Sequence, residues 1–60
     1  MITEKIKEQI EVVRASGETN MFDIDTVQRL AFEQDFYELV CWIEEDKKAY
    51  VKYILYGKED

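Results

Sequence analysis

The stretch from Asp35 to Ile43, DFYELVCWI, constrains the fold more than any other part of the sequence. Within nine residues it holds three aromatic residues, three aliphatic residues and the only cysteine of the chain. Its apolar side chains recur at the i, i+3, i+4, i+7 spacing of an amphipathic helix: Phe36, Leu39, Val40 and Ile43. Asp35 followed by Glu38 has the pattern of an N-terminal capping box. We therefore expect a central helix here, against which the rest of the chain packs.

The chain has to fold without covalent or metal cross-links. It has 60 residues, no histidine and one cysteine, so neither a zinc knuckle nor an intramolecular disulfide can form. A domain this small buries only about 60% of its unfolded surface and has little stability to spare. The 47% of hydrophobic residues then predict one domain over residues 1–60, stabilised by packed helices and by self-association, and we expect a homodimer.

A first helix is indicated near the N-terminus by an apolar stripe at helical spacing: Ile2, Ile6, Ile10 and Val13. Thr3 is placed to cap its start and Gly17 to end it. Turn-forming residues from Ser16 to Asn20 then interrupt the apolar pattern. This segment is expected to be a loop within the domain.

A second helix is expected from Thr26 to Gln34. Asp23 and Asp25 both precede it as candidate caps. Asp25 is favoured because Gln28 follows at the capping-box position. The same two aspartates resemble the start of a calcium loop, but the pattern fails two residues later, at Val27, so capping is the better interpretation.

The segment after the central helix is compatible with two structures. Tyr, Val and Ile between Ala49 and Tyr56 have high strand propensity, which allows a hairpin over residues 37–56. Helix is favoured because residues 44–49 contain no Gly, Pro or Asn, and because Glu44 would meet Lys48 at i, i+4. The predicted fold is all-α, a small bundle of three to four short helices, with an α+β fold as the alternative.

Charge is distributed unevenly along the chain. The net charge is −6, yet the segment from Glu18 to Asp46 has nine acidic residues and one basic residue, Arg29, a net of −8. Such a surface repels phosphate backbones, so we expect no direct nucleic-acid binding and a partner with a basic surface. A merely solvated face is the alternative. The candidate partner-binding acids are Glu38, Glu44, Glu45 and Asp46.

The sequence offers few residues in arrangements typical of catalytic sites. Cys41 has no histidine to deprotonate it, and its neighbours Val40 and Trp42 suggest a buried, inert thiol. Gly17 and Gly57 are isolated, so no phosphate-binding loop is indicated. We expect no enzyme activity, no cofactor and no metal.

The aromatic residues exceed what a core of this size readily buries. Tyrosine and tryptophan are favoured at interfaces, because they offer much contact area at low entropic cost. We expect self-association through Trp42, Tyr50 and Tyr53, with partial core burial as the alternative. Residues 27–43 also resemble a helix-turn-helix weakly, although Asp35 stands where its turn favours glycine and acids stand where base-reading side chains are needed.

The N-terminal residues alternate charge with isoleucine and do not form a signal peptide, and no apolar run reaches the about 18 residues of a membrane span. Together with the single thiol, this predicts a cytoplasmic location without membrane association.

Several segments together resemble a family of short phage and prophage proteins of Gram-positive bacteria that is catalogued as a domain of unknown function: residues 13–23, 27–28, 36–40, 43–45 and 53–55. The runs Asn20 to Asp23 and Phe36 to Val40 are its most specific part. The resemblance implies an accessory protein inside a bacterial host cell and supplies no catalytic residues. Similar proteins have glycine before the aromatic residue where this chain has Asp35.

A short acidic protein of this origin is expected to bind a host or phage protein and to inhibit or redirect it. Counteracting a bacterial defence system is the most concrete version. A regulator of phage transcription or packaging of helix-turn-helix type is one alternative, and a structural or assembly component is another.

Overall fold

The computed structural model describes residues 2–57 and contains four helices in that range. They are α1 (Glu4–Ser16), α2 (Ile24–Glu33), α3 (Tyr37–Glu45) and α4 (Lys47–Tyr56). No strand occurs within the described residues. The all-α prediction is therefore confirmed, and the alternative hairpin over residues 37–56 is wrong.

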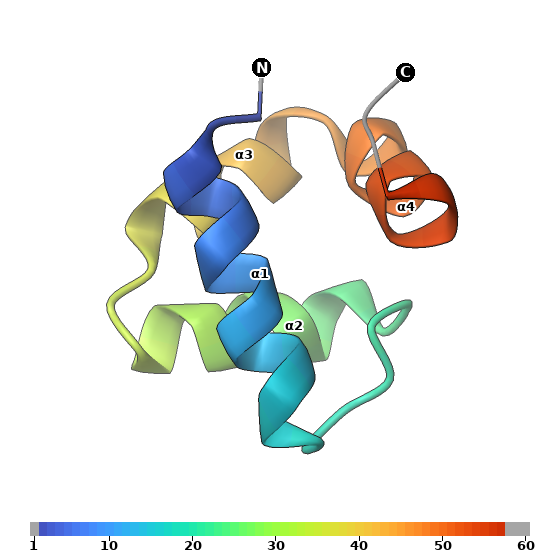
Figure 1. Cartoon of the computed structure of the whole chain (residues 1–60). Helices are drawn as coiled ribbons and strands as arrows, with labels where there is room; N and C mark the ends of the chain where they lie inside the picture. The colour runs from blue at the N-terminus through green and yellow to red at the C-terminus, as the bar shows by residue number, and fades with distance from the viewer. Residues whose placement is uncertain (1, 58–60) are drawn as a thin grey trace.

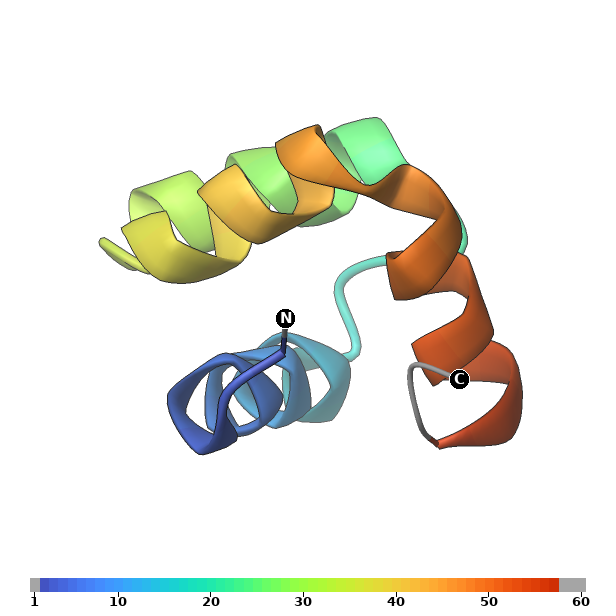
Figure 2. The same cartoon turned by 90° about the horizontal axis from the view of Figure 1, so that it is seen from above.

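The helices α2 and α3 form an antiparallel pair, the helical hairpin, on which the other two helices pack (Figure 1). Viewed from above, α2 and α3 run alongside each other, while α1 and α4 lie on the same side of the pair (Figure 2). The amide of Gln28 donates to the Val40 carbonyl at 3.3 Å and to Glu44 Oε2 at 3.0 Å. Gln28 of α2 thus bonds to two residues one turn apart on α3, and the two helices lie side by side.

The ends of α1 follow the sequence prediction. Thr3 Oγ1 accepts a hydrogen bond from the Ile6 amide at 3.2 Å, which satisfies one of the free donors of the first turn. Gly17 adopts a left-handed conformation with φ 68°, and its amide donates to the Arg14 carbonyl.

The start of α2 differs from the prediction, because Asp23 caps the helix and Asp25 does not. Asn20 Oδ1 accepts from the Phe22 amide at 2.8 Å, and the Asn20 carbonyl accepts from the Asp23 amide, so the preceding turn closes at Asp23. The Asp23 carboxylate then accepts from both the amide and the hydroxyl of Thr26. Helix α2 therefore begins two residues earlier than expected, at Ile24.

The turn between α2 and α3 is a Schellman motif. The Asp35 amide donates to the Phe32 carbonyl at 3.0 Å, and the Phe36 amide donates to the Ala31 carbonyl at 2.8 Å. Asp35 has φ 63°, the only positive φ of a non-glycine residue in the described range. An aspartate thus occupies the left-handed position that ends the helix, where it cannot act as the cap predicted for α3. Phe36 holds the cap position without a side-chain bond.

A single residue, Asp46, connects α3 to α4. Its extended backbone (φ −152°, ψ 83°) stops α3, and its carboxylate accepts from the Ala49 amide at 3.0 Å to start α4. The expected i, i+4 pair of Glu44 and Lys48 does not form, because the helix is broken between them.

The core lies between α1, the hairpin and the inner face of α4. Leu39 and Ile43 of the predicted stripe are fully buried, so the central helix is confirmed. The complete set of buried apolar residues is Ile6, Ile10, Val13, Val27, Ala31, Leu39, Trp42, Ile43, Tyr50 and Tyr53.

Two expectations about side-chain exposure are corrected by this core. Trp42, Tyr50 and Tyr53 do not project from the surface, and fold into the core of their own chain instead. They are therefore not available for the self-association proposed from the sequence. Cys41 is exposed and not buried, because Leu39 and Ile43 take the inner face of α3 and position 41 falls on the outer one.

Candidate functional site

An open groove of about 650 Å³ lies where the start of α1 meets the turn end of the helical hairpin. Its walls mix charged, amide and aromatic side chains: Lys5, Gln9, Gln34, Asp35, Phe36, Tyr37, Glu38 and Cys41. The first two come from α1 and the others from the turn and the start of α3. The groove therefore brings together residues that are about 30 positions apart in the sequence.

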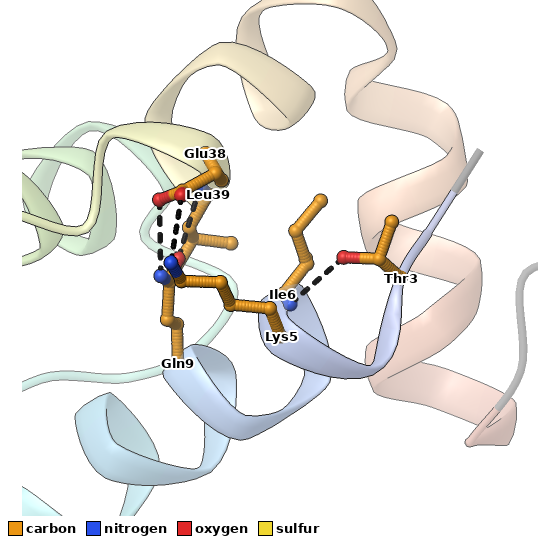
Figure 3. Close-up of polar contacts among 6 residues, drawn as sticks. All are labelled: Thr3, Lys5, Ile6, Gln9, Glu38 and Leu39. Carbon is orange, nitrogen blue, oxygen red and sulfur yellow. Dashed lines mark hydrogen bonds and ion pairs between the residues drawn. The ribbon is translucent and has the colours of Figure 1, made fainter.

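Gln9 is the residue that organises this groove (Figure 3). Its side chain is buried among the apolar residues of α1. Its Oε1 atom accepts from the Leu39 amide at 3.2 Å, and its Nε2 atom donates to Glu38 Oε1 at 3.2 Å. The Leu39 amide lies in the first turn of α3 and has no partner within that helix. Gln9 thus performs from α1 the capping function that the sequence assigned to Asp35.

Glu38, the first of the candidate acids, is held by two residues of α1. Lys5 Nζ lies 3.1 Å from Glu38 Oε2, beside the hydrogen bond from Gln9. The Gln9 bond, the Glu38 backbone amide and Lys5 together lower the pKa of Glu38 from 4.5 to about 2. The carboxylate is therefore ionised at neutral pH, and its charge is partly compensated by Lys5.

Two exposed aromatic residues, Phe32 and Tyr37, form an aromatic corner on the rim of the groove. Phe32 is 60% exposed and Tyr37 is 51% exposed, and their rings meet edge to face with centroids 5.5 Å apart. The Tyr37 hydroxyl donates to Asp35 Oδ1 at 2.9 Å, and this bond raises the pKa of Tyr37. The rings are thus held in position beside a carboxylate while remaining open to solvent.

The other three candidate acids lie at the opposite end of α3. Glu44 accepts from Gln28, Asp46 caps α4, and Glu45 is exposed. Glu38 and Glu45 share one face of α3 but are two turns apart, about 10 Å along the axis. The structure therefore does not bring the four predicted acids into one cluster.

Every acidic residue from Asp23 to Asp46 is exposed to solvent. We call this set the hairpin acidic surface: Asp23, Asp25, Glu33, Asp35, Glu38, Glu44, Glu45 and Asp46. Arg29 is the one basic residue in that span, and it pairs with Glu33 at 3.2 Å. The arrangement is suited to binding a cationic group. Within residues 2–57 no group of three or more potential ligands is placed to hold a metal ion.

Three residues of this site were missed from the sequence: Gln9, Phe32 and Tyr37. Gln9 could have been found, because it lies three residues after Ile6 and four before Val13, inside the buried arc of α1. Phe32 could not, since its exposure depends on where α2 ends and on how α3 packs against it.

The sequence matches the family described as Domain of unknown function (DUF5049) over residues 2–58. No curated protein and no solved structure matches the chain. None of the helices in residues 2–57 is long and apolar enough to cross a membrane.

Proposed function

The chain belongs to this family of unknown function, and we propose that it is a small accessory protein that binds a partner protein through the hairpin acidic surface. The role is binding and not catalysis. The partner has a basic surface, and the bound chain inhibits or redirects it.

The observation that carries this proposal is the combination of exposed carboxylates and exposed aromatic rings on the same hairpin. Asp35 accepts a hydrogen bond from the Tyr37 hydroxyl, and Glu38 lines the same groove as Tyr37. Glu33 is exposed and follows Phe32 in the chain. Interfaces typically centre on a few aromatic anchors with a polar rim. Arginine and lysine side chains also stack on aromatic faces while pairing with carboxylates. This corner therefore offers both interactions to a basic partner.

The charged rim sets the rate of association more than the final affinity. Attraction between opposite charges raises the rate at which the partners meet, and salt screens it. Binding is then fast at low ionic strength and weaker at high ionic strength. The apolar contact at Phe32 and Tyr37 supplies a part of the affinity that salt does not remove.

The phage and Gram-positive setting of the proposal comes from the sequence resemblance described above. Inside an infected bacterium, an acidic protein of this size can occupy a basic surface that normally holds nucleic acid. A nuclease or regulator of a bacterial defence system has such a surface, which makes an anti-defence inhibitor the concrete version of the proposal.

The helix-turn-helix alternative is not favoured by the geometry. A recognition helix crosses the preceding helix at a steep angle and presents side chains that read bases. Here Gln28 bridges to Val40 and Glu44, so α2 and α3 run antiparallel. The outer face of α3 presents Glu38 and Glu45.

The test is capture of a partner from lysates of Gram-positive hosts, with wild type and a charge-neutral variant as baits. The variant Glu44→Gln, Glu45→Gln, Asp46→Asn keeps hydrogen-bonding side chains, and Asn remains a good helix cap, so folding should be retained. Wild type should capture a basic protein that salt elutes. The variant should capture several-fold less.

A matched control removes the same number of charges from α1: Glu4→Gln, Glu8→Gln and Glu11→Gln. This variant should capture the partner as well as wild type does. Equal capture by all three baits, at low and at high salt, would contradict the proposal. Binding of wild type to labelled duplex DNA at low salt would also contradict it and would support the regulator instead.

A further inference from the structure

Helix α4 differs from the rest of the chain in the pairing of its basic residues. The basic residues of α1 and α2 each lie within 4.0 Å of an acidic residue of the chain: Lys5, Lys7, Arg14 and Arg29. The three lysines of α4 (Lys47, Lys48 and Lys52) are exposed and make no ion pair within residues 2–57. Helix α4 itself contains no acidic residue.

The same face of α4 is apolar between the lysines. Leu55 is 56% exposed and Tyr56 is 68% exposed, and Val51 is half-buried. An open groove of about 370 Å³ runs over this face and is lined by Lys47, Lys48, Val51 and Lys52. Among the described helices α4 contacts α3 alone, and the lysines of this face are exposed within residues 2–57. We call it the α4 lysine face.

We propose that the α4 lysine face docks onto the hairpin acidic surface of a second copy of the chain. The two surfaces are complementary in charge, since three unpaired lysines would meet carboxylates that have one basic residue among them. They are also complementary in apolar character, because Leu55 and Tyr56 would pack against the exposed rings of Phe32 and Tyr37.

We choose a second copy as the binding partner because every copy of the chain carries both complementary surfaces, the α4 lysine face and the hairpin acidic surface. This contact also offsets the limited stability of a 60-residue domain, since association buries apolar side chains that the monomer leaves exposed. The association surface is thus α4, and not the buried residues Trp42, Tyr50 and Tyr53.

The first test is the molar mass in solution, measured by sedimentation equilibrium. The wild-type mass should exceed the 7.2 kDa of one chain at about 10 mM salt and should fall toward it at about 1 M salt, where the screening length drops from about 30 Å to about 3 Å. A mass of one chain at every concentration and at low salt would overturn the proposal.

The decisive test is a charge exchange between two variants. In one, Lys47, Lys48 and Lys52 are changed to Glu, and in the other Glu44 and Glu45 are changed to Lys. Each variant alone should be monomeric, because like charges then face each other across the contact. An equimolar mixture should regain a mass above one chain. Two monomeric variants that do not associate on mixing would overturn the proposal.

A third variant, which leaves all charges in place, tests the contact even if the charge-reversal variants misfold. Leu55→Ser with Tyr56→Ser alters exposed residues only and should weaken wild-type association at least several-fold while the helical far-ultraviolet spectrum stays unchanged. An unchanged mass for this variant would contradict the apolar part of the contact. Wild type that stays monomeric but binds anionic vesicles or duplex DNA through α4 would assign the lysine face to a different occupant and overturn the proposal.

Discussion

Helices α1 and α4 both pack on α3, but different chemistry holds them there. Helix α1 combines its apolar stripe with the buried Gln9, whose side chain bonds to two consecutive residues of α3. Helix α4 relies on Tyr50 and Tyr53, and Tyr50 meets Trp42 edge to face with centroids 6.2 Å apart. The Tyr50 hydroxyl donates to the Met21 carbonyl at 2.7 Å and so links α4 to the loop before α2.

One small core thus holds two helices by contacts that respond to pH in opposite directions. The α1 attachment includes an ionised carboxylate, so acid weakens it. The α4 attachment includes a neutral phenol whose ionisation is suppressed by burial, so alkali weakens it. The predictions that follow separate the two attachments.

The largest effect is expected from Tyr50→Ala. Tyr50 is fully buried, and truncation of a large buried aromatic residue costs about 3–5 kcal/mol of unfolding free energy. Urea denaturation followed by far-ultraviolet circular dichroism measures the loss. Tyr56→Ala is the matched control at about 1 M salt, where the proposed association is screened. Tyr56 is exposed on the same helix, so this variant should change stability by less than about 0.5 kcal/mol. Equal losses for the two variants would show that α4 is not held by Tyr50.

The next largest effect is expected from Gln9→Ala. The change leaves the buried Leu39 amide without an acceptor, which costs about 1–3 kcal/mol. Gln28→Ala is the control, since Gln28 also bridges two elements but its bonds lie nearer solvent, and it should cost less. If both variants unfold at the same urea concentration as wild type, the polar attachment of α1 contributes nothing.

A smaller effect is expected from Tyr50→Phe, which removes the bond to Met21 and retains the ring. The loss should be about 0.5–1.5 kcal/mol at neutral pH. Burial raises the pKa of Tyr50 from 10.0 to about 12. The unfolded chain therefore loses this proton near pH 10 and the folded chain only near pH 12, so stability falls as the pH rises between these values. Between pH 10 and pH 12 the melting temperature should fall more steeply for wild type than for Tyr50→Phe.

The smallest effect is expected from the acid titration of Glu38. The folded pKa of Glu38 is about 2, below its ordinary 4.5, chiefly because of the Gln9 bond. The unfolded chain binds the proton first as the pH falls, so the contribution of Glu38 is complete above pH 4.5 and is lost toward pH 2. Glu38→Gln should flatten the decline of the melting temperature in that window. A parallel decline in both proteins would show that Glu38 does not respond to its partners.

The sequence predicted those parts of the fold that depend on residues three or four positions apart. The Thr3 cap, the Gly17 stop and the burial of Leu39 and Ile43 all follow from local spacing. The break at Asp46 was not predicted, because the residues around it are good helix formers. Aspartate is a favoured helix cap, but the sequence analysis considered Asp46 only as a partner-binding acid.

The parts that could not be predicted depend on how the helices cross. The cap of α3 comes from Gln9, which is 30 residues away from Leu39, and no local pattern indicates such a pair. The aromatic residues expected at the surface are buried, because α4 turns back over the core. Cys41 is exposed, because the inner face of α3 is taken by Leu39 and Ile43. The acidic residues of this segment are exposed, but the four predicted as a partner-binding set do not form one cluster, and the aromatic corner was missed.

The single residue between α3 and α4 has a consequence for assembly. Asp46 is the only residue between the two helices and caps the second one, so its backbone angles determine how the α4 lysine face is oriented relative to the hairpin acidic surface. When one surface of a protein docks onto a different surface of its neighbour, the rotation between successive copies decides between a closed ring and an open filament. In an assembly of this chain, the backbone angles of Asp46 would set that rotation and with it the symmetry of the particle.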